Sequence, residues 1–481
     1  MKSKLFLFEI ALLFLLVGCS KDFLKVYPET SLNEGNFYTS DNEFVSLVSG
    51  CYVPLRNAER WDHWVMSELK SDNLDQQFSA IAGNFETAYM DNLLTGAASI
   101  TVQNYWDISY QGVYRCNKAI SVLESSTYTW RDENIKNRSK GEAYFLRALY
   151  YFNLVRQYGG VPLVITPVTG KEAVEIKRSS EDEVYQLIIS DLNNAQDYLS
   201  KAATVEEKGR ANQSAALGIL GKVYLTRKDY SAASQVLKKV IDLKKFSLLL
   251  NYADLFDPNA KDYTETIFSV QYSESSSELA NDFIFFNVPN TSKGEVTNRP
   301  NISLRIAGSM EPSIELINAF EADDSRKNVA IQYWTGAGWD GIEKSFPYCA
   351  KYKPPQISPL NYCGDNFPVL RYADILLMYG ECLNNLGSTS EAAQYIFSVR
   401  KRAGLTNDIS QLSQAELDSL IEKERQVEFC FENQRWYDLV RRGTALDVMN
   451  AQGKEIDAYK ILQPIPGEEV FINKLEQNPG Y

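Results

Sequence analysis

The sequence predicts a mainly α protein, in which a tetratricopeptide-like helical scaffold carries an irregular, partly β insertion. Three observations lead to this fold class. Apolar residues recur at helical spacing through most of residues 40–245. Two separate segments share the spacing of small and apolar residues that is typical of a tetratricopeptide hairpin. Residues 246–364, which lie between those two segments, lose the helical period and are rich in Ser, Asn, Gly and Pro.

The N-terminus has the features of a secretory signal peptide. Two lysines precede the mostly apolar residues 5–17, a stretch that is too short to cross a bilayer as a helix. The run Leu-Val-Gly-Cys that ends at Cys19 resembles a bacterial lipobox, which directs acylation of the cysteine. We therefore expect residues 1–18 to be removed and residues 19–39 to form a lipidated tether. An ordinary signal peptide with a chance cysteine is the alternative.

Further scaffold helices are marked by a buried run and by two capping boxes. Residues 143–155 are apolar on nearly every side, so their helix should be buried, and a Gly-Gly pair and a proline stop it. Ser180 with Glu183 opens the helix EVYQLIISDLNNAQDYL, and Ser413 with Glu416 opens the helix LDSLIEKERQVEFCF. In each box the serine accepts a hydrogen bond from the third helical amide while the glutamate reaches back.

Two stretches repeat one tetratricopeptide pattern. They are LGKVYLTRKDYSAASQVLKKVI and YGECLNNLGSTSEAAQYIFSVR, and the small residues in each allow two helices to approach closely. Because the copies are far apart in sequence, they form no tandem array, and the fold must bring the two hairpins together in space. The matching positions are Leu220, Gly221, Tyr224, Ala233, Leu237 and Val240 in the first copy, and Tyr379, Gly380, Leu383, Ala392, Ile396 and Val399 in the second.

The insertion contains short β-prone runs, ETIFSVQY and DFIFF, rather than long helices. It also contains Cys349 and Cys363, the two cysteines that make the most plausible disulfide. Cys382 and Cys430 fall in helical patterns and are expected to be small apolar core residues. Apart from Cys19 the chain has too few cysteines for a disulfide scaffold, and no CxxC or CxxH spacing indicates a metal site.

Several function classes are disfavoured by composition and by missing motifs. The net charge of −13 and the lack of a basic cluster argue against nucleic acid as a partner. His63 is the only histidine, which limits acid–base catalysis, and neither G-x-S-x-G nor H-E-x-x-H occurs. The glycines of QYWTGAGWDG have G-x-G-x-x-G spacing, but no helix can start after them to bind a pyrophosphate. No cofactor is expected.

Opposite charges at i,i+3 fill the segment KERQVEFCFENQRWYDLVRRG. Paired carboxylates can act as acid and base in glycoside cleavage, but charge pairs on a helix surface are the more common explanation, and we favour it. A carboxylate-only hydrolase remains the best enzyme alternative. Trp106 and Trp436 lie in helical patterns and are expected to pack in the core. The pairs are Arg425/Glu428, Glu432/Arg435, Arg435/Asp438 and Asp438/Arg441.

Longer motifs along the mature chain resemble the SusD/RagB family of outer-membrane lipoproteins. The resemblance implies a tetratricopeptide-like scaffold with an inserted ligand-facing subdomain, no catalytic activity, and a SusC-like TonB-dependent barrel as partner. It also implies a lipid anchor in the outer membrane, with the protein facing the cell exterior. The matching stretches are CSKDFLKVYPETS, EAYFLRALYYFNLVRQYGGVPL, MEPSIELINAFEADDSR, LRYADILLMYGECLNNLG, VRKRAGL, KERQVEFCFENQRWYDLVRRG and LQPIPGEEVFINKLEQNPGY.

The sequence divides into three parts after the tether. Residues 40–245 form the helical scaffold, residues 246–364 form the irregular ligand-facing insertion, and residues 365–481 complete the scaffold and add a C-terminal tail. Binding residues usually lie on irregular segments that a rigid scaffold holds in place, so the insertion is the first place to look for them.

QYWTGAGWDG is the first candidate for ligand binding. We expect a mobile loop that offers Tyr333, Trp334 and Trp339 for stacking against a sugar ring or a peptide side chain. The alternative is that one tryptophan anchors the loop to the body.

The segment ERWDHWVMSELKSDN is the second candidate. Trp61 and Trp64 would share one helical face, and Asp72 and Asn73 follow as hydrogen-bonding groups for hydroxyls. Core packing of at least one of these tryptophans is the alternative. Tyr272 is a weaker candidate, because it falls in a strand pattern that alternates between core and surface.

The leading functional hypothesis is glycan binding and delivery to the barrel transporter. Peptide capture for the same kind of transporter is the second hypothesis. The third hypothesis is a helical-repeat module that only assembles other proteins. The aromatic-rich insertion favours glycan binding over this third hypothesis.

Overall fold

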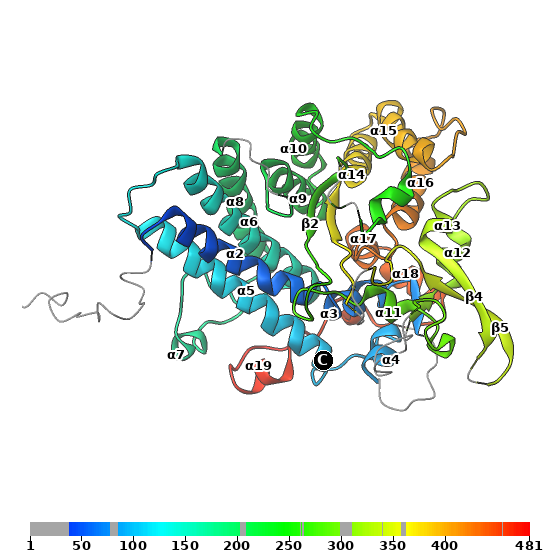
Figure 1. The fold of residues 1–481 in the computed structure, drawn as a ribbon, viewed down its shortest axis with the longest axis horizontal. Coiled ribbons are helices and arrows are strands. Elements are labelled where there is room, and N and C mark those ends of the chain that lie inside the picture. The colour runs from blue at the N-terminus through cyan, green and yellow to red at the C-terminus, as the bar shows by residue number, and fades with distance from the viewer. Residues whose placement is uncertain are drawn as a thin grey trace, which may run out of the picture.

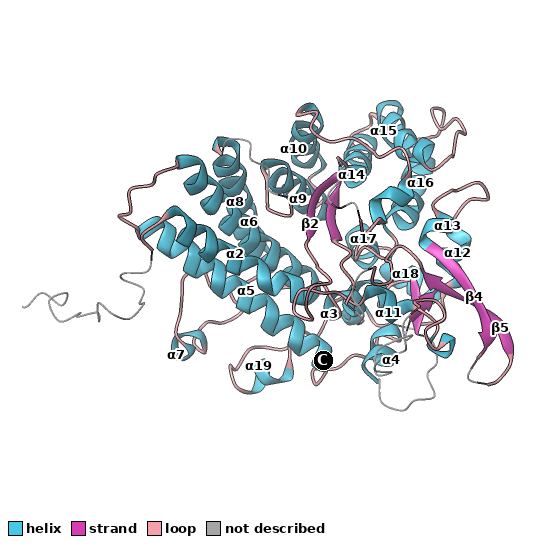
Figure 2. Ribbon diagram, viewed as in Figure 1, coloured by secondary structure: helices cyan, strands magenta, loops and turns pink. Residues whose placement is uncertain are grey.

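Helices packed side by side form the body of the molecule, as the ribbon shows (Figure 1). The computed structural model describes residues 38–76, 85–202, 208–259, 261, 264–298, 310–338, 340–356, 362–454 and 456–481, so Cys19 lies outside the described residues. Each helix contacts the next in the order α2, α5, α6, α8, α9, α10, α14 and α15. Strands are few and short, and they lie in the centre and on the right of Figure 2. The protein is therefore mainly α.

The scaffold helices before the insertion are α2 (Asp41–Ala58), α3 (Asp62–Trp64), the π-helix η1 (Val65–Leu69), α4 (Phe85–Asp91), α5 (Ile100–Ser125), α6 (Glu133–Tyr158), α7 (Gly170–Ala173), α8 (Glu181–Lys201), α9 (Gln213–Thr226) and α10 (Tyr230–Asp242). The later helices are α14 (Tyr372–Asn385), α15 (Thr389–Arg402), α16 (Gln414–Phe429), α17 (Arg435–Arg442), α18 (Ala445–Ala451), η4 (Ala458–Ile461) and α19 (Gly467–Phe471).

The short helices between them are η2 (Tyr252–Phe256), α11 (Phe283–Asn287), η3 (Asn290–Ser292), α12 (Ile314–Ala319) and α13 (Lys327–Ala330). The strands are β1 (Leu74–Gln76), β2 (Thr266–Val270), β3 (Met310–Pro312), β4 (Ile331–Ala337), β5 (Glu343–Cys349) and β6 (Phe367–Arg371).

The two predicted tetratricopeptide hairpins are α9–α10 and α14–α15, and they lie next to each other because α10 packs on α14. The repeated glycines have the same role in both hairpins. A methyl group on Gly221 would come within 2.6 Å of Leu237 Cγ, and one on Gly380 would come within 2.6 Å of Ile396 Cδ1. The small residue at this position thus sets the helix spacing, as the repeat pattern predicts.

The other predicted helix signals are also confirmed. Both capping boxes form, at Ser180 with Glu183 and at Ser413 with Glu416. Helix α6 is buried through residues 143–155 and ends at Gly159, whose φ of 73° places it in the left-handed region that glycine adopts most easily. Its buried face makes α6 the central helix of the main hydrophobic core.

Among the described residues, three two-stranded antiparallel ladders organise the insertion. The β1–β3 and β2–β6 ladders each pair a strand of the insertion with a strand outside it, whereas β4 and β5 form a hairpin at the right-hand edge of Figure 1. The run ETIFSVQY supplies β2, as predicted. The prediction of a strand for DFIFF is wrong, because helix α11 buries all four of its apolar side chains and leaves no alternating face.

The structure does not contain the disulfide that the sequence made plausible. Cys349 and Cys363 are both buried, and no disulfide joins them. Cys349 ends strand β5 and joins the main core, while Cys363 forms a β-bridge with Asn281 and packs in a small cluster with α11. The two side chains thus belong to different clusters.

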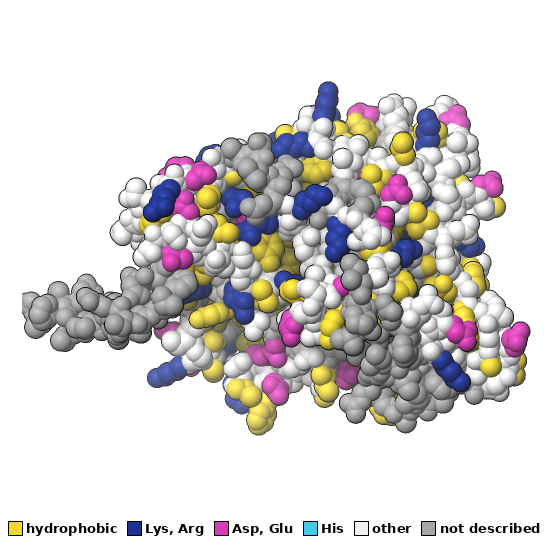
Figure 3. Space-filling model, in the orientation of Figure 1, with side chains coloured by type: hydrophobic (Ala, Val, Ile, Leu, Met, Phe, Trp, Pro, Cys, Tyr) yellow, Lys and Arg dark blue, Asp and Glu magenta, His cyan; other side chains and the backbone are white. Residues whose placement is uncertain are grey.

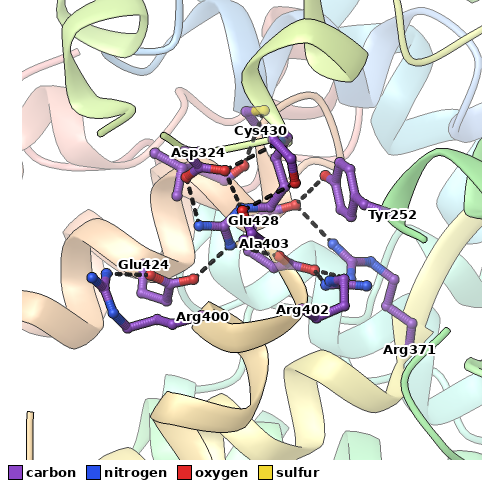
Figure 4. Close-up of polar contacts among 12 residues, drawn as sticks. Tyr252, Asp324, Arg371, Arg400, Arg402, Ala403, Glu424, Glu428 and Cys430 are labelled. Atoms are coloured by element: carbon purple, nitrogen blue, oxygen red, sulfur yellow. Dashed lines mark hydrogen bonds and ion pairs between the residues drawn. The ribbon is translucent and has the colours of Figure 1, made fainter. Parts of the chain in front are cut away.

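The charges in the second half of α16, Glu424, Arg425 and Glu428, are buried rather than on the surface, and Figure 4 shows the contacts of Glu424 and Glu428. Glu428 accepts from Arg326 at 2.7 Å and from Arg371 at 2.5 Å, and it also pairs with Arg402. Burial alone raises the pKa of this carboxyl, but the three guanidinium groups overcome that effect and hold the pKa well below its ordinary value. Since Arg326 comes from the insertion and Arg371 and Arg402 come from the scaffold, Glu428 joins the two.

This arrangement corrects the predicted i,i+3 pairs. Among the four, only Asp438 with Arg441 forms, at 2.8 Å. Arg425 of α16 instead bonds Asp438 of α17 and Asp374 of α14. The chain turns between Phe429 and Arg435, so residues on either side of this turn do not follow one helical spacing. Trp106 and Trp436 are buried, as predicted.

The surface mixes the two signs of charge. On the face drawn in Figure 3, lysine and arginine side chains are interspersed with aspartate and glutamate. In the described ranges, we find no helix that is both long and apolar enough to cross a membrane.

Candidate functional site

The β4–β5 hairpin holds Trp334 in a fixed orientation. Its ring lies 5.7 Å from the ring of Phe346, the residue opposite it on β5. The indole Nε1 donates a hydrogen bond to Glu295 Oε2 at 2.9 Å. The ring also lies over Gly336, where an added methyl group would come within 2.4 Å of it. The Trp334 ring is therefore partly exposed, and contacts with Phe346, Glu295 and Gly336 fix its orientation.

The hairpin also corrects the expected mobile aromatic loop. Tyr333 and Trp334 are neighbours on a strand, so their side chains point to opposite faces. Tyr333 is 52% exposed and lies opposite Pro347. The two rings cannot form one plate, and Trp339 lies outside the described residues. Strand β5, rather than a helix, follows the glycines, as expected for a sequence that does not bind a dinucleotide.

Trp61 and Trp64 share a face, but that face packs on the insertion. Trp64 is 0% exposed and stacks on Phe283 at 5.5 Å, and Trp61 contacts the edge of Phe286 at 4.7 Å. Trp64 is therefore a core residue and not a ligand contact. Trp61 keeps some exposure, although its ring is also engaged with α11.

Asp72 and Asn73 are buried as well, at the junction of β1 and β3. Asp72 receives two hydrogen bonds from Arg435, and Asn73 donates to Glu68 Oε2 at 3.0 Å. The backbone oxygens of both residues accept hydrogen bonds from Ser313, which precedes α12. These groups hold the insertion to the scaffold, so neither is free to bind a hydroxyl.

Tyr272 is also a structural residue. It is buried, its hydroxyl donates to the carbonyl of Arg56 at 2.8 Å, and its ring meets Phe283 edge-on at 5.5 Å. The expectation of a binding role is therefore not supported by its position.

An exposed aromatic pair that the sequence analysis missed lies on α4. Phe85 and Tyr89 are 63% and 48% exposed, and their rings stack at 6.2 Å. Helix α4 contacts β1, β1 pairs with β3, and β3 contacts β5, so a continuous run of elements links this pair to the hairpin. The i,i+4 spacing of two aromatic residues in FETAYMD was the available signal.

A small pocket, open to solvent, lies beside η2 and the β2–β6 ladder. Phe256, Lys261, Asp365 and Asn366 are among the residues that line it. Burial raises the pKa of Asp365 to about 7, and its Oδ1 accepts the amide N–H of Lys353 at 3.2 Å. A carboxyl group of this kind can exchange hydrogen bonds with a hydroxylated ligand.

The structure does not assemble a metal centre from the residues that it describes. Within those ranges, no three His, Cys, Asp or Glu side chains are grouped so as to hold an ion. The single histidine, His63, is buried, with Nδ1 2.6 Å from Glu59 Oε2 and Nε2 2.7 Å from the Tyr437 hydroxyl.

Comparison with known proteins identifies the family. A family model described as "Starch-binding associating with outer membrane" matches residues 22–225, and the model of the SusD family matches residues 343–481. SusD-like protein P2 of Formosa agariphila is 28% identical, with 98% of each chain covered. A SusD-like protein of Bacteroides ovatus is 29% identical over 92% of this chain and 82% of its own.

A solved structure named "Laminarin binding SusD-like protein" has the same fold. It superposes with a TM-score of 0.79 and 25% identity, covering 92% of this chain and all of its own. The two family models match the first part of the scaffold and the region from strand β5 to the C-terminus, and the relatives span nearly the whole length. The chain belongs to the SusD/RagB family.

Proposed function

We propose that this protein is a non-catalytic, glycan-binding lipoprotein of the outer membrane, which faces the cell exterior and delivers oligosaccharides to a SusC-like TonB-dependent transporter. The observation that carries the proposal is the fixed, partly exposed indole of Trp334. A ring that is already held by Phe346 and Glu295 loses little conformational freedom when a sugar stacks on it.

The fold and the relatives support a glycan as the ligand. The chain shares its fold and 25% of its sequence with a protein named for laminarin binding. Exposed aromatic side chains suit the apolar faces of sugar rings, and the hairpin with Tyr333 and Trp334 and the α4 pair supply four of them. Trp61, which keeps some exposure beside α11, is a further candidate contact.

Binding without hydrolysis fits the position of the only histidine. His63 is enclosed between Glu59 and Tyr437, where a ligand at the hairpin cannot reach it. The attachment and the orientation rest on the sequence of the N-terminus. Cys19 follows a lipobox-like run, and residues 20–22 after it resemble the export signal of surface lipoproteins.

Ligand binding is tested with an array of glycans and peptides, followed by calorimetry on the ligand found. Trp334→Ala should weaken glycan binding by about 1 kcal/mol or more, because it removes the aromatic contact. Trp436→Ala is the matched control, since it removes a buried tryptophan and should cost about 3–5 kcal/mol of folding stability without changing the affinity of folded protein.

Tyr333→Ala, Phe85→Ala and Tyr89→Ala then show which exposed rings belong to the site. Loss of binding in the α4 variants alone would move the site from the hairpin to α4. An early melting transition of Trp334→Ala with unchanged affinity would make that residue an anchor. Peptide binding without glycan binding would overturn the proposed ligand class.

Surface display and partnership are tested on cells. Protease added to intact cells should cleave the protein, and Cys19→Ser should release it from the membrane. Extraction in mild detergent should recover it with a large barrel protein. A protein that resists protease, or that is purified alone while the barrel is expressed, would contradict delivery.

A further inference from the structure

A polar pocket of about 170 Å³, open to solvent, lies where the two tetratricopeptide hairpins meet α16 and α17. Its lining comes from the turn between α9 and α10, the end of α14, the first half of α16 and the end of α17. A pocket of this volume has room for roughly ten waters, and therefore for one ring-sized molecule. The residues that line it include none from the β4–β5 hairpin or from α4, so it is separate from the proposed glycan site.

Arg442 fixes the acidic wall of this pocket. Its Nη1 donates to Glu381 Oε1 at 3.1 Å, and its Nη2 donates to Asp418 Oδ2 at 2.5 Å. Its Nε donates to Glu422 Oε2 at 3.3 Å. Arg441 binds both carboxylate oxygens of Glu381, at 2.5 Å and 2.8 Å. The carboxylates of the wall are therefore held in place before any ligand arrives.

Two carboxylate oxygens on this wall are open to a ligand. Asp418 uses Oδ2 for Arg442, and its side chain is 42% exposed. Glu422 uses Oε2 for Arg442, its Oε1 has only a 3.6 Å contact with Arg435, and its side chain is 24% exposed. The two acids are four residues apart on α16, so they lie on one face of the helix. Within the described ranges, neither Asp418 Oδ1 nor Glu422 Oε1 accepts a hydrogen bond.

Tyr230, the first residue of α10, lines the pocket beside these acids. Its side chain is partly exposed, and its hydroxyl forms no hydrogen bond with the part of the chain that the structure describes. Burial raises the pKa of this phenol, and the negative charges of Glu381 and Asp418 act in the same direction. The hydroxyl therefore keeps its proton, and the ring beside it offers an apolar surface.

The charges around the pocket already balance. The lining contains three carboxylates and three cations, which are Glu381, Asp418, Glu422, Lys228, Arg441 and Arg442. A ligand with a net charge would disturb this balance. Because the open groups on α16 are acceptors, the ligand must also donate several hydrogen bonds. A neutral molecule rich in hydroxyl groups meets both conditions.

We propose that this pocket binds one ring of a neutral sugar, whose hydroxyls donate to Asp418 Oδ1 and Glu422 Oε1 and whose ring lies against Tyr230. Hydrogen bonds to a charged acceptor are stronger than those between neutral groups. An aromatic side chain suits the apolar face of a sugar ring. The ring comes from a free sugar or from the end of a longer glycan. Since the pocket lies apart from Trp334, it is a second sugar-binding position on the same protein.

Small probes separate the hydroxyl and the charge requirements on the intact protein. Glucose, galactose and mannose are neutral and carry hydroxyls, glucuronate adds a negative charge, and tetrahydropyran keeps the ring without hydroxyls. Saturation-transfer NMR titrations should give saturable binding of at least one neutral sugar and none of tetrahydropyran. Glucuronate should bind about tenfold more weakly, because its carboxylate meets the acidic wall. Equal binding of glucuronate, or no saturable binding of any neutral sugar, would overturn the proposal.

A trisaccharide of the sugar that binds best identifies the source of the ring. Tighter binding of the trisaccharide than of the single sugar indicates the end of a glycan, and weaker binding indicates a free sugar.

Variants place the binding in this pocket. In Asp418→Asn the amide oxygen turns to Arg442 and the amide NH₂ replaces the acceptor that faces the pocket, so sugar affinity should fall about tenfold. Tyr230→Phe removes only the hydroxyl and should weaken binding about threefold. Asp242→Asn is the matched control, because Asp242 also pairs with a cation on a helix surface, Lys238, but does not line the pocket.

Each variant is first checked by its melting curve without ligand, and Glu422→Gln tests the same wall if Asp418→Asn does not fold. Unchanged sugar affinity in both Asp418→Asn and Tyr230→Phe would overturn the assignment. Trp334→Ala should leave this binding intact. Binding that is lost in Trp334→Ala but kept in Asp418→Asn would contradict the pocket and support the hairpin, so the failures of the two sites are distinguishable.

Discussion

Asp72 and Arg435 form a bidentate ion pair that joins the turn before β1 to helix α17. Arg435 Nε lies 2.6 Å from Asp72 Oδ1, and Nη2 lies 2.7 Å from Oδ2. Both side chains are almost fully buried. Through the backbone of Asp72, the same contact reaches Ser313 in the insertion. One pair thus connects three distant parts of the sequence.

Asp72→Asn should destabilise the protein by up to about 3–5 kcal/mol, because it leaves the buried Arg435 charge with only the longer 3.6 Å contact to Glu422. Urea denaturation measures the change. Asp182→Asn is the control: its partner Arg227 is exposed, so the loss should stay below about 1 kcal/mol. Similar small losses in both variants would show that the buried pair does not hold the junction.

Asp365 should make stability fall as the pH rises. Burial raises its pKa to about 7 in the folded protein, from an ordinary 3.8. Between these two values the unfolded chain is ionised while the folded one keeps its proton, and above pH 7 the folded protein must bury the charge. Asp365→Asn removes this cost, so its gain over the native protein should be larger at pH 8 than at pH 4.5 by roughly 3 kcal/mol.

Chemical denaturation at the two pH values tests the sign. Asp408→Asn is the opposite control, because the Ser410 amide lowers the pKa of Asp408 and its charge is favourable at high pH. A gain for Asp365→Asn that is the same at both pH values would contradict the buried, protonated carboxyl.

Gly112 is required by the packing of α5 on α6. A methyl group there would lie 2.3 Å from the ring of Tyr150, whose hydroxyl is bound to the carbonyl of Cys51. Gly112→Ala should therefore cost about 1–3 kcal/mol, although alanine favours the helix. Gly50→Ala in α2 meets only Arg115 at 3.8 Å, and it should stabilise by about 0.5–1 kcal/mol. Thermal melting of the pair checks this, and a stable Gly112→Ala would refute the close approach.

The cysteines should behave as buried thiols. Six cysteines are buried and take part in no disulfide, so a thiol reagent should label none of them in the folded protein: Cys51, Cys116, Cys349, Cys363, Cys382 and Cys430. After unfolding without reductant, all six should react. Mass spectrometry of the labelled peptides counts them. A Cys349–Cys363 peptide pair that needs reduction would instead restore the disulfide.

The local elements follow from short windows of the sequence. Helix caps such as Ser180 with Glu183 depend on residues three apart, and the repeat glycines depend on contact within one hairpin, so their patterns are complete in a short window. The family motifs were recognisable for the same reason. The strand predicted for DFIFF failed, since a short apolar run fits a buried helix as well as a strand.

The tertiary structure decided which polar and aromatic residues are available to a ligand. Trp61 and Trp64 met the sequence criterion of a shared face, but only the fold shows that α11 covers it. From the sequence, Asp72 is a candidate for binding a hydroxyl, but in the fold both of its carboxylate oxygens accept hydrogen bonds from Arg435. The exposure and the ion pairing of a side chain depend on residues hundreds of positions away in the sequence. The spacing of residues within a short segment therefore cannot predict either of them. The hairpin that separates Tyr333 from Trp334 is a property of the folded chain alone.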